Sequence, residues 1–187
     1  MGFFQRMLGK WERKRLLKEV ERSLKSLEAL CGMDIADIWT LDKESDFLVA
    51  MQGWLFRKSG EEEHPEWLSP AERTFFAVQS FINEVNNGGF PQFLDNSSGQ
   101  FAGEIEDALR AVGATRAAEI CGEMLGYIGG PIPTDWAARR AWLDDQADAW
   151  EENSSVLNEL EDQLMEEMDA LEDLSYQWVM DHREEFS

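Results

Sequence analysis

Histidine and cysteine, the residues most common in catalytic and metal sites, are scarce in this chain, which has two of each in 187 residues. Cys31 and Cys121 lie far apart and fit neither a metal-ligand spacing nor a disulfide framework, so both are expected to be free thiols. Paired Glu-x-x-His motifs of the di-metal helical bundles are absent, as are glycine-rich phosphate-binding loops. His64 follows three glutamates in a polar loop, where a solvated side chain is favoured over a cation ligand. These absences predict no catalytic residues, no metal and no cofactor, and hence a protein that is not an enzyme.

Long hydrophobic runs are also missing. No apolar run is long enough to span a membrane, and the N-terminus lacks the apolar core of a signal peptide. Arg6 stands where an N-myristoylation signal has Ser or Thr. The sequence therefore predicts a cytoplasmic protein.

Basic residues are few and unevenly placed, and the formal net charge is −21. Residues 1–27 contain eight Lys and Arg against three Glu, whereas residues 28–187 contain nine Lys and Arg against 35 Asp and Glu. A surface so acidic repels phosphate, which excludes direct nucleic-acid binding by the main body. Basic proteins or cations are the expected partners.

Apolar residues recur at helical spacing along most of the chain, and no alternating pattern indicates strands. The predicted fold class is all-α: a compact multi-helix domain with an N-terminal basic amphipathic helix over residues 3–30. Its apolar side consists of Phe3, Phe4, Met7, Leu8, Trp11, Leu16, Leu17, Val20, Leu24 and Leu27. Its basic side consists of Lys10, Arg13, Lys14, Arg15, Lys18 and Arg22. An anionic membrane, a second copy of the helix and the acidic remainder of the chain could each cover it, and the last two are favoured because the remainder supplies opposite charge.

A polar loop over residues 59–65 is the best candidate domain boundary. We therefore divide the chain into residues 1–60, the basic helix with a short helical extension, and residues 67–187, an acidic helical domain. The extension is expected to contain two short helices, at 34–41 and 45–56.

The second domain is expected to begin with a helix capped by Ser69, with Pro70 at its first position and Glu72 closing a capping box. Later helices are expected over residues 101–112 and 115–128. Another should follow an N-cap at Thr134. The tryptophans of this last helix are expected to lie in the core. They are Trp136, Trp142 and Trp150.

The stretch from Phe81 to Gly99 is predicted to form a sharp corner between two helical segments, because Asn and Gly tolerate the left-handed conformation that ends a helix. The motif residues are Glu84, Asn86, Asn87, Gly88, Gly89, Phe90 and Gln92. Two interpretations stay open. In the favoured one the motif is a helix stop, with Glu84 and Gln92 bonding nearby backbone. In the other, Glu84, Asn87, Gln92 and Asn96 line a small polar pocket for a ligand or peptide.

This corner resembles the signature of the DNA mimic protein nineteen family, a bacterial family of acidic, all-helical domains. The resemblance rests on Glu84–Phe90, Gln92-Phe93 and Asn96–Gly99, with Ser69–Arg73 before them and Ala108–Ala114 after them. A late acidic helix ending near His182 and Phe186 also matches, so the resemblance covers residues 67–187 approximately. It implies a dimeric, helical protein that occupies the DNA-binding surface of a transcription regulator, and it assigns no individual binding residues.

Residues 144–187 hold sixteen acidic residues and one basic residue, Arg183. Leu157, Leu160, Leu164, Met168, Leu171 and Leu174 form an apolar stripe, and the opposite faces carry eight carboxylates. These are Glu159, Glu161, Asp162, Glu166, Glu167, Asp169, Glu172 and Asp173. Along a helix rising about 1.5 Å per residue, they approach the charge spacing of one DNA strand, about 3.4 Å per phosphate. A solvated surface, or adaptation of the host to salt, would explain the same composition.

The sequence predicts a non-enzymatic acidic binding protein, a DNA mimic that blocks the DNA-binding surface of a transcription regulator or nucleoid protein. The expected partner-binding residues are Glu159, Asp162, Glu166, Asp169 and Asp173, with Asp144, Asp145 and Asp148 as a second patch. The alternative is an immunity-type or accessory interaction module whose partner has no connection with DNA.

Overall fold

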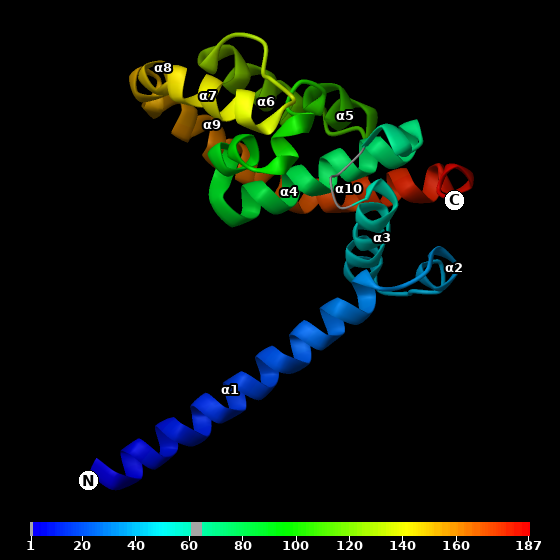
Figure 1. Cartoon of the computed structure of the whole chain (residues 1–187), viewed down its shortest axis with the longest axis vertical. Coiled ribbons are helices and arrows are strands. Elements are labelled where there is room, and N and C mark those ends of the chain that lie inside the picture. The colour runs from blue at the N-terminus through cyan, green and yellow to red at the C-terminus, as the bar shows by residue number, and fades with distance from the viewer. Residues whose placement is uncertain (1, 61–64) are drawn as a thin grey trace. The chain divides into compact units, whose positions relative to one another are not determined.

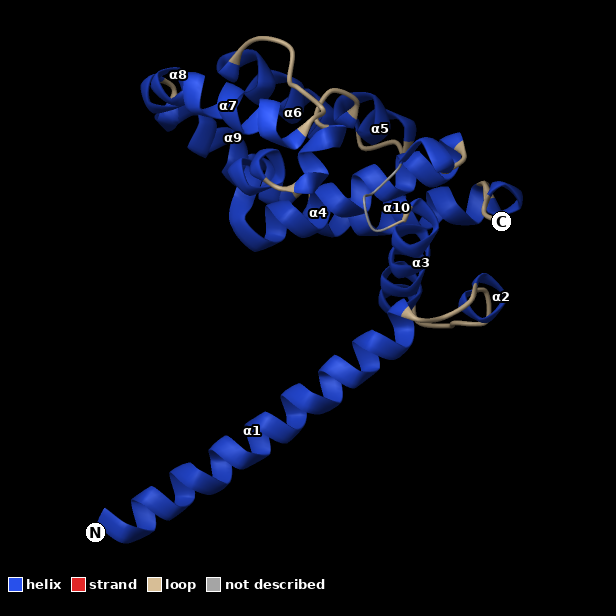
Figure 2. Ribbon diagram, viewed as in Figure 1, coloured by secondary structure: helices blue, strands red, loops and turns tan. Residues whose placement is uncertain are grey.

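The computed structural model describes residues 2–60 and 65–187, and side chains from residue 15 onward. His64 and the apolar and basic side chains predicted before residue 15 lie outside the described residues. The described chain is helical and contains no strand, as predicted (Figure 2). Its α-helices are α1 (Gly2–Cys31), α2 (Ile35–Ile38), α3 (Glu44–Ser59), α4 (Pro70–Asp95), α5 (Ile105–Ala111), α6 (Thr115–Ile128), α7 (Trp136–Asp145), α8 (Ala147–Glu152), α9 (Ser154–Glu166) and α10 (Met168–Asp181). Short 3-10 helices are η1 (Pro65–Trp67), η2 (Ser97–Phe101) and η3 (Arg183–Glu185).

Contacts divide the chain into two compact units, Met1–Arg57 and Lys58–Ser187. In the first unit, α1 ends close against α3: a Cβ on Gly53 would lie 2.7 Å from the Cys31 Cα, so only glycine allows this approach. Arg57 donates from its guanidinium to the carbonyls of Met33 and Gly53. The described part of α1 leaves its apolar side exposed. What covers that side stays a prediction.

The second unit is built around α4, which contacts α5, α7, α9 and α10 (Figure 1). Its N-terminus has the predicted capping box: Ser69 Oγ accepts from the Glu72 amide, and Glu72 accepts from the Ser69 amide. Glu72 is fully buried, and Lys58 Nζ lies 2.7 Å from its carboxylate. The buried Gln79 of α4 donates to Ser175 of α10, and Trp178 donates to the Ala71 carbonyl. These bonds fix α10 beside α4.

Phenylalanine fills the core under the corner of α4. Phe81 meets Phe93 edge to face at 5.0 Å between ring centroids, and Phe76 meets Phe101 at 5.8 Å. Such edge-to-face pairs are favoured by the ring quadrupoles, in addition to the area that they bury. The aromatic residues on both sides of the corner therefore hold its two segments against one core.

Several predicted helix limits and one burial prediction were wrong. The helix expected over 101–112 begins only at Ile105, because η2 and a turn occupy the residues before it. The side chain that caps α7 is Asp135 rather than Thr134, since its Oδ1 accepts from the Ala138 amide at 2.8 Å. None of the three tryptophans is buried in the core as predicted: Trp142 and Trp150 are half-buried, and Trp136 is 52% exposed. Trp136 lies at the first position of its helix, where its indole Nε1 donates to the Asp95 carbonyl.

No described helix is both long enough and apolar enough to cross a membrane.

Candidate functional site

The corner of α4 is a break at two glycines that divides α4 into two helical segments. Gly88 has φ −161° and ψ 20°, and Gly89 has φ 78° and ψ −178°, a conformation that is essentially restricted to glycine. Helical geometry resumes at Phe90, whose freed amide donates to Glu161 Oε1 of α9 at 2.7 Å. A carboxylate at this new N-terminus also interacts favourably with the helix dipole. The predicted helix stop is confirmed, and a carboxylate from a distant helix satisfies the segment that follows.

Glu84 ties together the two sides of the break. Its Oε2 accepts from Gln92 Nε2 and from Asn96 Nδ2, each at 2.7 Å. The favoured interpretation had Glu84 and Gln92 bonding backbone; instead they bond each other. A Cβ on Gly88 would lie 2.0 Å from Gln92 Oε1, so the carboxamide requires glycine at this position.

Beside the corner is an open groove between the end of α4 and helices α7 and α8, with a volume of about 940 Å³. Asn87, Gln92 and Asn96 line it, and Trp150 of α8 also lines it. Three of the four residues that would line the polar pocket considered from the sequence therefore line this groove, and its role in binding stays a prediction. Glu84 is not among its lining residues and acts through the two amides.

Arg139 of α7 contacts the end of α4 and is only 1% exposed. Its guanidinium donates to the carbonyls of Leu94, Asn96, Pro133 and Thr134 at 2.7–3.1 Å. Burial lowers its pKa, while the carboxylates of Asp135 and Asp95 raise it. An arginine nevertheless stays charged at neutral pH, and here backbone carbonyls solvate that charge.

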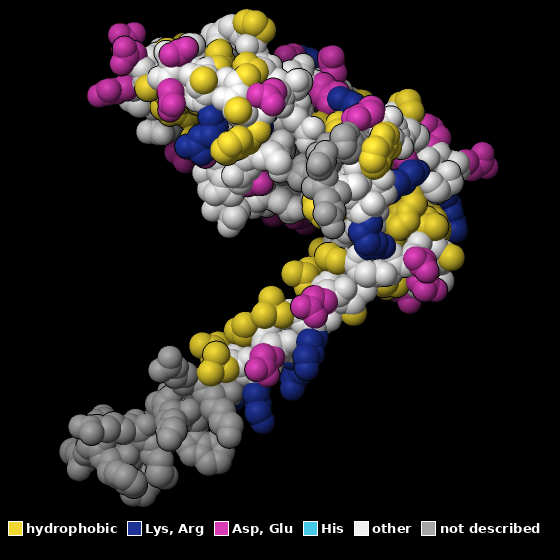
Figure 3. All heavy atoms as spheres, viewed as in Figure 1, with side chains coloured by type: hydrophobic (Ala, Val, Ile, Leu, Met, Phe, Trp, Pro, Cys, Tyr) yellow, Lys and Arg dark blue, Asp and Glu magenta, His cyan; other side chains and the backbone are white. Residues whose placement is uncertain are grey.

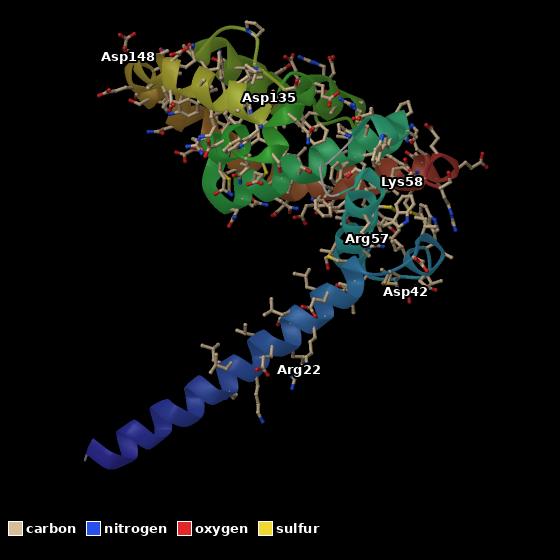
Figure 4. All side chains as sticks on the ribbon, in the orientation of Figure 1. Arg22, Asp42, Arg57, Lys58, Asp135 and Asp148 are labelled. Carbon is tan, nitrogen blue, oxygen red and sulfur yellow. The ribbon has the colours of Figure 1, made fainter. Side chains whose placement is uncertain are left out.

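All eight predicted partner-binding carboxylates are exposed. None has a hydrogen bond or ion pair within the described part of the chain. They are Asp144 and Asp145 on α7, Asp148 on α8, Glu159, Asp162 and Glu166 on α9, and Asp169 and Asp173 on α10. Carboxylates are prominent at the α8 end of the unit in Figure 3, and Figure 4 labels Asp148 there. No three acidic, histidine or cysteine side chains among the described residues are grouped closely enough to hold a metal ion.

Two of the carboxylates assigned to the outer face of residues 159–173 were misplaced. Glu161 is half-buried and caps Phe90, and Glu167 is half-buried at the interruption between α9 and α10. The remaining acidic face, which we call the acidic surface, consists of Glu159, Asp162, Glu166, Asp169, Glu172 and Asp173.

The sequence profile of the family described as DMP19-like protein matches residues 66–182. The chain belongs to the DMP19-like protein family. The match includes the corner, the groove and all eight predicted carboxylates, while α1, α2 and α3 precede it. No curated protein and no solved structure matches the chain.

The few cations of this DMP19-like unit are already engaged. Arg73 binds Glu104 through two nitrogens, Arg110 binds Glu106, and Arg140 lies 3.3 Å from Asp95. Arg116 lies 3.6 Å from Glu119. Lys58 binds Glu72, Arg139 binds backbone carbonyls, and Arg183 also has an interaction partner. No described cation of this unit therefore pairs with a carboxylate of the acidic surface.

Cys121 carries no nucleophilic function in this arrangement. It is fully buried in α6, and burial raises the pKa of its thiol well above the ordinary range, with Glu106 raising it further. A thiol held protonated does not act as a nucleophile or metal ligand.

Sequence reasoning missed Arg139 and Glu161. The only available signals were an arginine inside a Trp-rich helix and a glutamate preceding Asp162, and neither differs in pattern from a solvated charge. Their roles depend on partners 43 and 71 residues away in the chain.

Proposed function

We propose that this protein acts by binding, as a DNA mimic that occupies the DNA-binding surface of a basic protein such as a transcription regulator or nucleoid protein. The observation that carries this proposal is the acidic surface: exposed carboxylates without partners among the described residues, on a unit whose cations are engaged elsewhere. Membership of the DMP19-like family supports it.

The linear charge density of the acidic surface is close to that of one strand of DNA. Its six carboxylates lie on α9 and α10 between residues 159 and 173, which would span roughly 21 Å as one uninterrupted helix at about 1.5 Å per residue. That spacing of about 3.5 Å per charge is close to the roughly 3.4 Å per phosphate along one strand. The charge spacing therefore stays close to that of one DNA strand even though Glu161 and Glu167, two of the eight carboxylates listed from the sequence, are not on the acidic surface.

The mimic would act by competition. A DNA-binding protein presents Lys and Arg to phosphate, and a carboxylate surface of similar density offers the same cations an alternative anion. The attraction is between exposed charges, so it weakens steeply as salt screens them.

The test is retention of a basic DNA-binding protein from host lysate on the full-length chain at low salt, followed by elution with salt and by competition with duplex DNA. The variant Glu166→Lys/Asp169→Lys should lose at least tenfold in retention, because it reverses two neighbouring charges of the acidic surface. The matched control, Asp34→Lys/Asp42→Lys, makes the same charge change at exposed positions of the other unit. It should retain the partner.

Two outcomes would overturn the proposal. If the retained partner survives high salt and ignores duplex DNA, the chain is an interaction module of another kind, held through an apolar contact. If both double variants behave like the parent chain, the carboxylates are a solvated surface.

A further inference from the structure

The groove beside the α4 corner is distinct from the acidic surface on α9 and α10. It combines polar residues of α4 with an apolar wall from Leu143 and Trp150, on helices that follow much later in the chain. A groove that unites an aromatic wall with several polar groups can orient a specific ligand, which a flat charged surface does not do.

Hydrogen bonding fixes which atoms the two amides can offer to a ligand. A carboxylate only accepts, so Glu84 requires the NH₂ groups of both Gln92 and Asn96 to face it. The oxygen of each carboxamide then points away from Glu84. Gln92 Oε1 consequently lies over the bare Cα of Gly88. Glu84 thus acts as a positioning residue: by holding the two NH₂ groups, it leaves the amide oxygens of Gln92 and Asn96 as hydrogen-bond acceptors.

Carboxylates add to these acceptors. Asp95 and Glu151 line the same groove. Asp95 pairs with Arg140 at 3.3 Å, but both side chains are about half exposed, and an exposed pair of this kind exchanges at little cost. The groove therefore offers oxygen acceptors and negative charge next to an indole.

We propose that this groove binds an arginine side chain of the protein partner. A guanidinium is planar, carries five donors and stacks on aromatic faces, so it can use the amide oxygens, Glu151 and Trp150 together. Lysine offers a compact charge without the planar fork and fits the arrangement less well. The inference rests on the proposed function, because DNA-binding surfaces present arginines. An arginine bound in the groove would fix how the partner is oriented on the acidic surface, which charge attraction alone does not do.

The probe is the tripeptide acetyl-Gly-Arg-Gly-amide, titrated into the full-length protein at 150 mM salt. The readout is the ¹H–¹⁵N signal of the Trp150 indole. Parallel titrations use peptides with lysine or citrulline in place of arginine. Citrulline keeps the shape and removes the charge. We expect a saturable shift with arginine, and binding at least tenfold weaker with citrulline.

Substitutions locate the contact. Glu151→Gln should weaken binding about tenfold. Trp150→Leu should abolish it, and because this variant removes the reporter indole, its binding is measured by isothermal titration calorimetry beside the parent chain. Glu152→Gln removes the same charge from the next residue of α8, which does not line the groove, and should leave binding unchanged. Glu84→Gln should weaken arginine binding several-fold while leaving Glu151 in place, because one amide can then turn its NH₂ group into the groove.

Equal affinity for citrulline and arginine, or equal effects of Glu151→Gln and Glu152→Gln, would overturn the inference. The test also separates the two proposals. If the arginine peptide does not bind but charge reversal on the acidic surface abolishes partner retention, mimicry stands and the groove inference falls. If the peptide binds and no DNA-binding protein is retained, the groove inference stands without mimicry.

Discussion

Gly89 shows how a single residue can be required by two separate constraints. Its φ of 78° with ψ near −178° is accessible only to glycine, and a Cβ there would lie 2.0 Å from Glu161 Oε1. Any residue with a Cβ at this position would suffer both the backbone strain and the clash with Glu161. The Glu161 contact links this constraint to α9, the helix that carries half of the acidic surface.

We predict that Gly89→Ala lowers the free energy of unfolding by about 3 kcal/mol, because alanine is strained in this conformation and displaces the Glu161 cap. Urea unfolding, monitored by circular dichroism, measures this change in the free energy of unfolding. The control is Gly126→Ala in α6, where a Cβ would meet nothing within 4 Å. Alanine there should raise stability by up to about 1 kcal/mol. Equal destabilisation by the two substitutions would contradict this account of the corner.

At the scale of elements, α7 is held to the end of α4 by Arg139 rather than by an apolar face. Its guanidinium joins the carbonyls of Leu94 and Asn96, at the end of α4, to those of Pro133 and Thr134, just before α7. Gly99 makes room for it, since a Cβ there would lie 2.5 Å from Arg139 Nε. The groove exists because this contact keeps α7 and α8 beside α4.

Arg139→Met should therefore destabilise the protein by about 3 kcal/mol, because it removes one buried and three part-buried hydrogen bonds to backbone carbonyls. It should also weaken arginine-peptide binding in the groove. Thermal unfolding and the Trp150 titration measure the two effects. Arg140→Met is the control, because Arg140 is half exposed, pairs with Asp95 at the surface and lies 5.5 Å over the Trp136 ring. It should change stability by less than about 1 kcal/mol. Wild-type stability in Arg139→Met would show that the carbonyls find other donors.

On the scale of the whole molecule, charge is divided between the two units. Residues 58–187 contain 29 acidic and seven basic residues, whereas residues 1–57 contain nine acidic and ten basic residues. Self-repulsion in the second unit opposes its compact state and provides the field that the proposed function uses. The carboxylates that the proposed function requires therefore also lower the stability of the unit.

We predict that raising sodium chloride from 20 mM to 500 mM increases the Tm of the protein by about 5 °C, since salt screens this repulsion. Differential scanning calorimetry measures it. Glu166→Lys/Asp169→Lys reduces the net negative charge, so its Tm should rise less over the same range. A Tm that falls with salt would show that attractive ion pairs outweigh repulsion.

The helical class, the capping box of α4, the break at Gly88-Gly89 and the family could all be predicted from the amino-acid sequence. These depend on local rules: apolar periodicity, cap chemistry and the conformational freedom of glycine. The sequence also identified the exposed carboxylates, because residues opposite an apolar stripe face water. Their role in binding stays a prediction.

Which charged side chains have partners within the protein became clear only from the packing of the helices. Glu161 and Glu167 share a helical pattern with Glu166, yet Glu161 caps Phe90 and Glu167 lies half-buried at a helix junction. Arg139 has the same local signal as Arg140, yet one is buried among carbonyls and the other is half exposed. Periodicity places a side chain on a face, but its partners come from segments distant in sequence, and long-range packing alone brings those segments together.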